Sequence, residues 1–119
     1  MILVDTSVWI DHLRASEPRL VGLLHRTEVL CHPWVVGELA LGQLADREQV
    51  LTLLQSLPTV GTVTSSEALL FLSAHRLHGL GIGYVDLQLL ASAAVTPGTR
   101  LWTKDKRLCG AADRLDLAA

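Results

Sequence analysis

The first four residues, Met, Ile, Leu and Val, form an entirely apolar run that stops at Asp5. The run is rich in residues that favour strands and has no polar face, so it predicts a central strand that is buried on both sides. A strand of this kind needs a layer of helices over each face of its sheet. The start of the chain therefore favours a layered α/β fold.

Later segments repeat this pattern, because short apolar runs alternate with helical periodicity along the chain. Further strands are predicted at residues 29–31, 59–63, 100–103 and 115–117. Alternating strands and helices are typical of a parallel sheet that is covered on both faces. We therefore expect a three-layer α/β/α domain with a central parallel sheet of about four to five strands.

Helices are predicted between these strands from capping residues and helix breakers. Thr6 or Ser7 can cap the first helix, Asp46 can cap the fourth, and a cluster of glycines after residue 78 ends the fifth. The expected helices cover residues 8–13, 17–26, 34–44, 46–56, 65–80, 84–95 and 105–112.

The composition sets the size and class of the protein. A chain of 119 residues is long enough for one domain, and apolar residues make up 50% of it but aromatic residues only 4%, so the core should be aliphatic. No run reaches the roughly 18 apolar residues of a membrane span, and the N-terminus has no secretory signal pattern. We therefore expect a cytoplasmic protein without membrane association, in which Cys31 and Cys109 are reduced core thiols.

Four acidic residues lie inside or beside strongly apolar runs, whereas acids such as Asp46 have polar neighbours. The four are Asp5, Glu38, Asp86 and Asp105. An unpaired carboxylate in apolar surroundings costs several kcal/mol or becomes neutral. If all four point inward, basic side chains or a divalent cation must meet them, and a hard cation takes oxygen ligands from several carboxylates at once.

The predicted sheet brings these acids towards one edge. Asp5 follows the first strand and Asp105 follows the strand at 100–103, and ligands of parallel sheets bind beyond the carboxyl ends of the strands. Glu38 and Asp86 lie on helices that follow this edge or pack beside it. In the first turn of its helix, Asp86 should meet free N–H groups that favour its ionised form. Taken singly, each aspartate could also be a simple helix cap.

Four segments that contain these acids resemble, in the same order, the motifs of PIN domains, which are metal-dependent ribonucleases. The segments read VDTSVWID, VGELALG, GYVDLQLLASA and LWTKDKRL. The resemblance extends over residues 2–108, and the nearest group is that of the VapC-type toxins of bacterial toxin–antitoxin pairs. The resemblance therefore implies a single PIN domain over residues 1–119.

The resemblance also implies roles for individual residues. The family's acidic quartet binds Mg²⁺ or Mn²⁺ and is matched by Asp5, Glu38, Asp86 and Asp105. Thr103 matches the Ser/Thr position whose hydroxyl would hydrogen-bond a carboxylate or a metal-bound water. Thr6 and Ser7 match small polar positions that support the pocket. The implied activity is endoribonucleolytic hydrolysis of RNA phosphodiester bonds by the toxin component of a type II toxin–antitoxin system, which a cognate antitoxin neutralises.

The residue types agree with this chemistry. Carboxylate oxygens select Mg²⁺ or Mn²⁺ over zinc, and no Cys-x-x-Cys or His-x-x-x-His spacing competes. Such an ion would activate water and stabilise the leaving oxygen, while the carboxylates hold the ion. The net charge of −2 does not exclude RNA, because 8 acidic residues remain against 10 basic ones once the four acids are set aside.

Basic side chains outside the pocket are needed to hold RNA, and each could equally be an ordinary solvated cation. The candidates are Arg14, Arg76, Lys104, Lys106 and Arg107. Three histidines could assist proton transfer, although lone histidines on helices are more often structural. They are His12, His75 and His78.

The apolar content exceeds what the core of so small a chain needs, which predicts a surface that a partner covers. Candidates for this surface, which could equally be core residues, are Trp9, Leu13, Leu20, Trp34 and Leu41. As the resemblance implies, the partners would be an RNA substrate, a cognate antitoxin and a second copy of the chain in a homodimer.

Two other functions remain open from the sequence. A receiver-like phosphoacceptor domain also has an acidic metal pocket, but it requires an aspartate at the end of its third strand, and residues 59–63 offer none. A catalytically silent PIN-like protein-binding module would keep the fold without the chemistry. The complete set of four acids argues against this second alternative.

Overall fold

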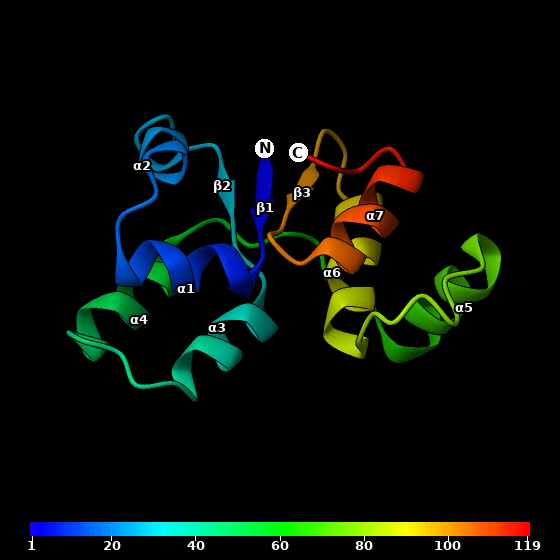
Figure 1. Cartoon of the computed structure of the whole chain (residues 1–119), viewed down its shortest axis with the longest axis horizontal. Coiled ribbons are helices and arrows are strands. Elements are labelled where there is room, and N and C mark those ends of the chain that lie inside the picture. The colour runs from blue at the N-terminus through cyan, green and yellow to red at the C-terminus, as the bar shows by residue number, and fades with distance from the viewer.

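Three short parallel strands form the centre of the protein, all 119 residues of which are described by a computed structural model (Figure 1). β1 (Ile2–Val4) lies between β2 (Val29–Leu30) and β3 (Arg100–Trp102), so the strand order is β2-β1-β3. Both neighbours run parallel to β1. The buried central strand predicted at the start of the chain is therefore confirmed.

The sheet has three strands, so the expectation of four to five was wrong in number. Of the two other segments predicted as strands, 59–63 contributes one isolated bridge, between Thr59 and Cys31, and Ala118, just after 115–117, forms another with Leu101. Neither segment pairs further as a strand. After Thr59, for example, the N–H of Gly61 donates to a side-chain hydroxyl at 3.0 Å instead of to the sheet. These segments extend the sheet edge by single residues only.

Seven helices surround the sheet, one at each predicted place. They are α1 (Thr6–Arg14), α2 (Pro18–His25), α3 (Pro33–Ala40), α4 (Arg47–Ser56), α5 (Ser65–His75), α6 (Tyr84–Val95) and α7 (Lys106–Arg114). Figure 1 shows α1 to α4 on the β2 side of the molecule and α5 to α7 on the β3 side. Helices therefore flank the sheet on both sides, as expected for an α/β fold.

Two helices end earlier than predicted. α3 stops at Ala40 and α5 stops at His75. After α5, Arg76 adopts a left-handed φ of +52°, and the N–H of Leu77 turns back to the carbonyl of Leu72. This helix end buries Leu77 in the core, so the apolar periodicity continues past the last helical residue.

The helix caps also differ in part from the prediction. Asp5 caps α1, whereas Thr6 and Ser7 lie inside that helix. Asp46 precedes α4, but it has a φ of +53° and its side chain makes no capping hydrogen bond. Asp105 caps α7. Two of the four acids therefore combine a capping contact with a position at the carboxyl end of a strand.

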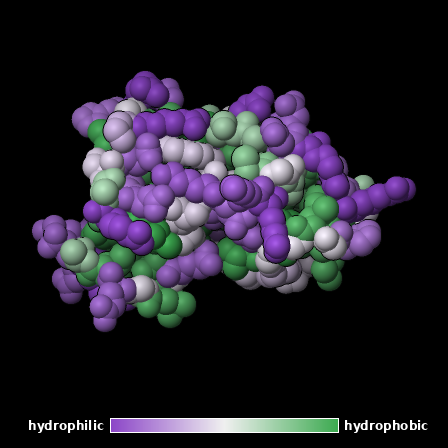
Figure 2. Space-filling model, in the orientation of Figure 1, coloured by the Kyte–Doolittle hydropathy of each residue, from purple (hydrophilic) through white to green (hydrophobic).

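Apolar side chains remain exposed around α3 and beside α5 (Figure 2). Of the five residues proposed for an apolar surface, Leu13, Trp34 and Leu41 are exposed, and Leu41 has 90% of its surface in solvent. Trp9 and Leu20 instead belong to the core, which is the alternative that the sequence left open for them. None of the helices has the length and apolar character that crossing a bilayer requires.

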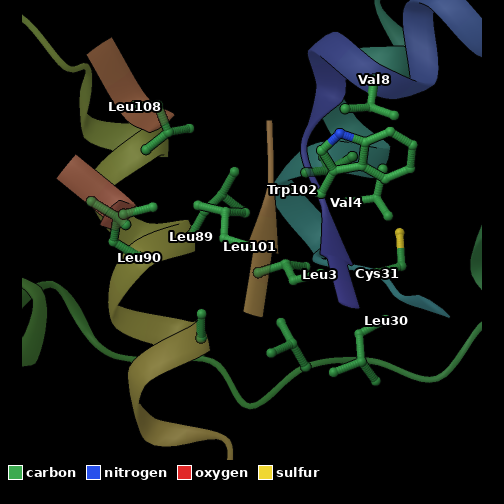
Figure 3. Packing of buried hydrophobic residues seen from close by; sticks show 14 of the residues in the cluster. Leu3, Val4, Val8, Leu30, Cys31, Leu89, Leu90, Leu101, Trp102 and Leu108 are labelled. Carbon is green, nitrogen blue, oxygen red and sulfur yellow. The ribbon is translucent and has the colours of Figure 1, made fainter. Parts of the chain in front are cut away.

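A cluster of 24 buried apolar residues fills the space between the sheet and its helices (Figure 3). Leu3, in the middle of β1, pairs with Leu30 and Leu101 and is fully buried. The core is mainly aliphatic, as predicted. Cys31 belongs to this cluster, and burial raises the pKa of its thiol to about 11. Cys109 is exposed, contrary to the expectation of two core thiols.

α6 is the most enclosed helix and fixes the position of Asp86 at its start. Every residue from Leu87 to Ala93 is buried, including the polar Gln88 and Ser92. The helix packs against both α5 and β3. Because a helix that is buried all round cannot rotate without opening the core, Asp86 is held in one direction.

Candidate active site

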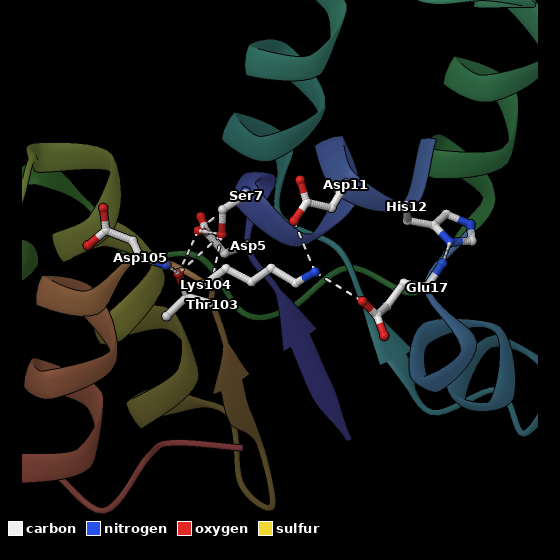
Figure 4. A network of polar contacts seen from close by, with 8 residues as sticks. All are labelled: Asp5, Ser7, Asp11, His12, Glu17, Thr103, Lys104 and Asp105. Atoms are coloured by element: carbon white, nitrogen blue, oxygen red, sulfur yellow. Dashed lines mark hydrogen bonds and ion pairs between the residues drawn. The ribbon is translucent and has the colours of Figure 1, made fainter. Parts of the chain in front are cut away.

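Asp5 is the most enclosed of the four acids, with 6% of its surface exposed. It directly follows β1, and its Oδ2 accepts hydrogen bonds from the hydroxyls of Ser7 at 2.6 Å and Thr103 at 2.8 Å (Figure 4). The N–H of Ser7 is a third, longer donor at 3.4 Å and caps α1. Donors from α1 and from the end of β3 therefore orient this carboxylate.

The turn after β3 is bonded to the start of α1. The N–H of Lys104 donates to the Ser7 hydroxyl at 3.0 Å, and the N–H of Asp105 donates to the Thr103 hydroxyl at 3.0 Å. Asp105 Oδ1 in turn accepts from the N–H of Leu108 at 2.9 Å. Figure 4 shows the side chain of Asp105 near the carboxyl ends of β1 and β3. The edge predicted from the sequence thus does bring Asp5 and Asp105 together.

Glu38 and Asp86 come to this edge from helices. Glu38 Oε1 accepts from the hydroxyl of Thr6 at 2.7 Å, which joins α3 to α1. Asp86 Oδ2 accepts from the N–H of Gly83 at 3.0 Å in the first turn of α6. Glu38 and Asp105 are exposed and Asp86 is half-buried. Of the four acids only Asp5 is buried, so the condition that all four point into the interior is not met, and the site lies at a rim that water reaches.

All four carboxylates share one pattern of hydrogen bonding. In each, one oxygen accepts from a protein donor and the other has no protein partner. The free oxygens are Oδ1 of Asp5, Oε2 of Glu38, Oδ1 of Asp86 and Oδ2 of Asp105. The protein therefore orients each acid through one oxygen and leaves the second available to a ligand.

Burial raises the pKa of Asp86 above its ordinary value, and the negative charges of Asp5, Asp105 and Glu38 raise it further. The hydrogen bond from the N–H of Gly83 lowers it but does not outweigh them. The helix terminus thus favours the ionised form, as expected, but burial and the neighbouring charges outweigh it and the net pKa is raised. The other three carboxylates therefore lie within electrostatic reach of Asp86.

The donor set suits a hard divalent cation, although the side chains do not enclose one as they stand. No group of three or more His, Cys, Asp or Glu side chains closes around a single ion position. Oxygen ligands alone favour Mg²⁺ or Mn²⁺, and Mg²⁺ keeps several waters, so it needs few direct protein ligands. A tighter cage requires rotation of exposed side chains, for which Glu38 and Asp105 have room.

Lys104, one of the five candidate RNA contacts, is already paired within the protein. Its Nζ lies 3.0 Å from Oε2 of Glu17 and 3.0 Å from Oδ2 of Asp11 (Figure 4). These hydrogen bonds raise the pKa of the Lys104 ammonium group, and the bond to Glu17 has the larger effect. The other four candidates take part in no ion pair.

The three candidate histidines form no hydrogen bond with the acids. Nδ1 of His12 accepts from the N–H of Glu17 at 3.1 Å. His75 lies against Phe71 with the ring centroids 4.5 Å apart, and His78 lines a small apolar cavity near α5. The geometry therefore gives these histidines structural surroundings and no link to the acidic site.

Asp11 and Glu17 belong to the surroundings of the site but were not predicted from the sequence. Asp11 follows Ser7 by four positions, so both side chains lie on one face of α1, and this spacing was a usable signal. Glu17 precedes α2 in a short connection, where no periodicity indicates the direction of a side chain. Only the folded chain brings it to Lys104.

A groove of about 580 Å³ lies beside Glu38, between α1, α3 and α4. Apolar residues predominate in its walls, among them Ile10, Leu13, Leu39, Leu44 and Val50. Glu38 belongs both to this groove and to the acidic site, so a chain segment lying in the groove would reach the acids at one end.

Comparisons with known proteins identify the family of the chain. The PIN domain family model matches residues 2–114. Ribonuclease VapC32 of Mycobacterium tuberculosis, in two strains, is 55% identical over 108 residues, which cover 91% of this chain and 87% of the relative. The crystal structure of FitAcB from Neisseria gonorrhoeae has a TM-score of 0.63 and 26% identity, and the match covers 95% of this chain and 94% of that chain. The chain therefore belongs to the PIN-domain family, within which it resembles the VapC-type ribonucleases.

Proposed function

We propose that this protein is a Mg²⁺- or Mn²⁺-dependent endoribonuclease that hydrolyses phosphodiester bonds of RNA. The observation that carries this proposal is the meeting of four carboxylates at one sheet edge, each held through one oxygen and free at the other. Sites built from oxygen ligands alone suit Mg²⁺ and Mn²⁺, the divalent cations that enzymes commonly use to act on phosphate groups. The 55% identity to a protein named as a ribonuclease supports the same class of activity.

The roles of the residues follow from their contacts. The residues that would hold the ion are Asp5, Glu38, Asp86 and Asp105. A divalent ion would supply Lewis-acid activation of water and would neutralise charge at the scissile phosphate. Thr103 and Ser7 keep Asp5 oriented by donating to its Oδ2. The attacking oxygen comes from water, and the bond between phosphorus and the leaving ribose oxygen breaks, so no carboxylate forms a covalent bond.

We propose further that this ribonuclease is the toxin of a type II toxin–antitoxin system, acting on RNA in the cytoplasm. The groove beside Glu38 supports an antitoxin partner, because an amphipathic segment could bury Leu13 there and present a basic side chain to the acids. A homodimer is supported by the exposed apolar residues of α5, where Leu69 and Leu70 have 56% and 71% of their surface in solvent.

The decisive test is RNA cleavage by the purified protein with Mg²⁺ or Mn²⁺. We expect cleavage that EDTA abolishes and that Asp5→Asn reduces by about 100-fold or more, since the variant loses a ligand oxygen. Asp113→Asn is a matched control, because Asp113 is an exposed acid at the far end of α7. Cleavage that survives both the chelator and Asp5→Asn would refute the metal site. Absence of cleavage in the wild type, with partner binding retained, would favour a silent binding module.

A further inference from the structure

Lys104 lies beside the acidic site, yet its charge is directed away from it. Figure 4 shows the side chain running from the turn after β3 along α1, and its Nζ contacts Oδ2 of Asp11 and Oε2 of Glu17, each at 3.0 Å. Its backbone N–H donates to the hydroxyl of Ser7, which itself donates to Asp5. The residue is thus bonded at both ends, and only the backbone end belongs to the acidic site.

The group formed by Lys104, Asp11 and Glu17 carries more negative than positive charge. One ammonium faces two carboxylates, so Lys104, Asp11 and Glu17 together carry a formal charge of −1. No other cation pairs with either carboxylate. The three side chains are partly exposed, with 36%, 46% and 26% of their surfaces in solvent. Ion pairs at such positions are weak and screened by salt, so a phosphate can compete for the ammonium group.

We propose that Lys104 is a phosphate-binding cation that Asp11 and Glu17 restrain, so that these two carboxylates set how tightly the RNA backbone binds beside the acidic site. This inference rests on the proposed ribonuclease function. Removal of both carboxylates changes the formal charge of the group from −1 to +1 and frees the ammonium group. The backbone bond from Lys104 to Ser7 does not depend on the side chain, so changes at Nζ can be separated from the orientation of Asp5.

The test measures binding of a fluorescein-labelled oligouridine by anisotropy in EDTA, with every protein carrying Asp5→Asn. Asp11→Asn/Glu17→Gln should bind more tightly, and its log–log dependence on salt should steepen by about 0.7, the value for one added phosphate contact on a single strand. A difference of that size in slope means that the affinity advantage of the variant grows about fivefold for each tenfold decrease in salt concentration. Adding Lys104→Met should abolish the gain, and Lys104→Arg should restore it.

A matched pair of substitutions controls for net charge. Asp113→Asn/Asp116→Asn also removes two negative charges, but from exposed positions near the C-terminal end of α7. Asp116, like Asp11 and Glu17, takes part in an ion pair. An equal gain in this control, a gain that persists with Lys104→Met, or no gain at all would each overturn the inference. Binding without metal does not depend on cleavage. Failure of the ribonuclease proposal would therefore show in the cleavage assay, and failure of this inference in the salt dependence.

Discussion

At the scale of single residues, the Thr103 hydroxyl sets the orientation of Asp5. It donates at 2.8 Å to the same oxygen that Ser7 binds. We expect Thr103→Val to lower cleavage activity by about 10- to 100-fold, because loss of a group that orients a metal ligand has this order of effect. Thr103→Ser should keep most of the activity. Initial rates across a Mg²⁺ titration would check this, and equal losses in the two variants would mean that the hydroxyl alone does not account for the effect.

Asp86 destabilises the metal-free protein as long as it is ionised. Burial and the three neighbouring acids raise its pKa in the folded state. At pH values between the pKa of Asp86 in the unfolded state and its raised pKa in the folded state, the folded protein binds more protons than the unfolded chain. Its stability therefore falls as the pH rises through the folded-state pKa. Asp86→Asn should therefore melt above the wild type at pH 7 in EDTA, and the difference should vanish below the unfolded-state pKa. Melting curves from pH 3 to 8 measure this, and a variant that melts lower at pH 7 would contradict it.

Sequence context located these acids but misjudged their exposure. Glu38 lies between Val36 and Leu39 in the sequence, and this neighbourhood suggested a buried carboxylate. A helix directs adjacent residues to different faces, so Leu39 is buried while Glu38 is exposed. The family resemblance implied that the Thr103 hydroxyl bonds a carboxylate or a metal-bound water, and in the structure its partner is Asp5. The net pKa direction of Asp86 was not, since it depends on burial and on charges distant in sequence.

At the scale of elements, α6 links the core to the site. Leu89 is fully buried at its centre, and the helix carries Asp86 in its first turn. Leu89→Ala should lower the free energy of unfolding by about 2 to 5 kcal/mol, because it removes core volume that the neighbours cannot refill. Leu53→Ala on α4, where the residue has 50% of its surface in solvent, should change it by less than about 1 kcal/mol. Urea denaturation compares the two, and equal losses would show that α6 is not the enclosed element.

The beginnings of the elements were predicted better than their ends. Strand 100–103 and helix 84–95 were recognised from local apolar runs and breakers, and they appear as β3 and α6. α5 ends at His75 because Arg76 adopts a left-handed conformation and Leu77 packs into the core. The apolar periodicity of the sequence continues through Leu77, so it does not reveal this helix end. Edge strands likewise depend on which neighbour accepts their hydrogen bonds, and that choice is not encoded locally.

At the scale of the whole molecule, the acidic site joins the two groups of helices. Asp5 and Glu38 come from the first half of the chain, and Asp86 and Asp105 come from the second half (Figure 1). Their mutual repulsion acts across this junction. A divalent ion bound to all four would replace repulsion by attraction between the halves, and the stability of the fold should therefore depend on metal.

We expect Mg²⁺ or Mn²⁺ to raise the unfolding temperature, with a stabilisation of about 2.7 kcal/mol at 100 times the dissociation constant. The increment should grow as pH rises through the titration of Asp86, because protons compete with the ion for the carboxylates. Scanning calorimetry in EDTA, in MgCl₂ and in NaCl of equal ionic strength measures it. Asp5→Asn should remove most of the increment while Asp113→Asn keeps it. Equal stabilisation of the wild type and Asp5→Asn would mean that the ion binds elsewhere, and that the two halves meet at this edge without a metal between them.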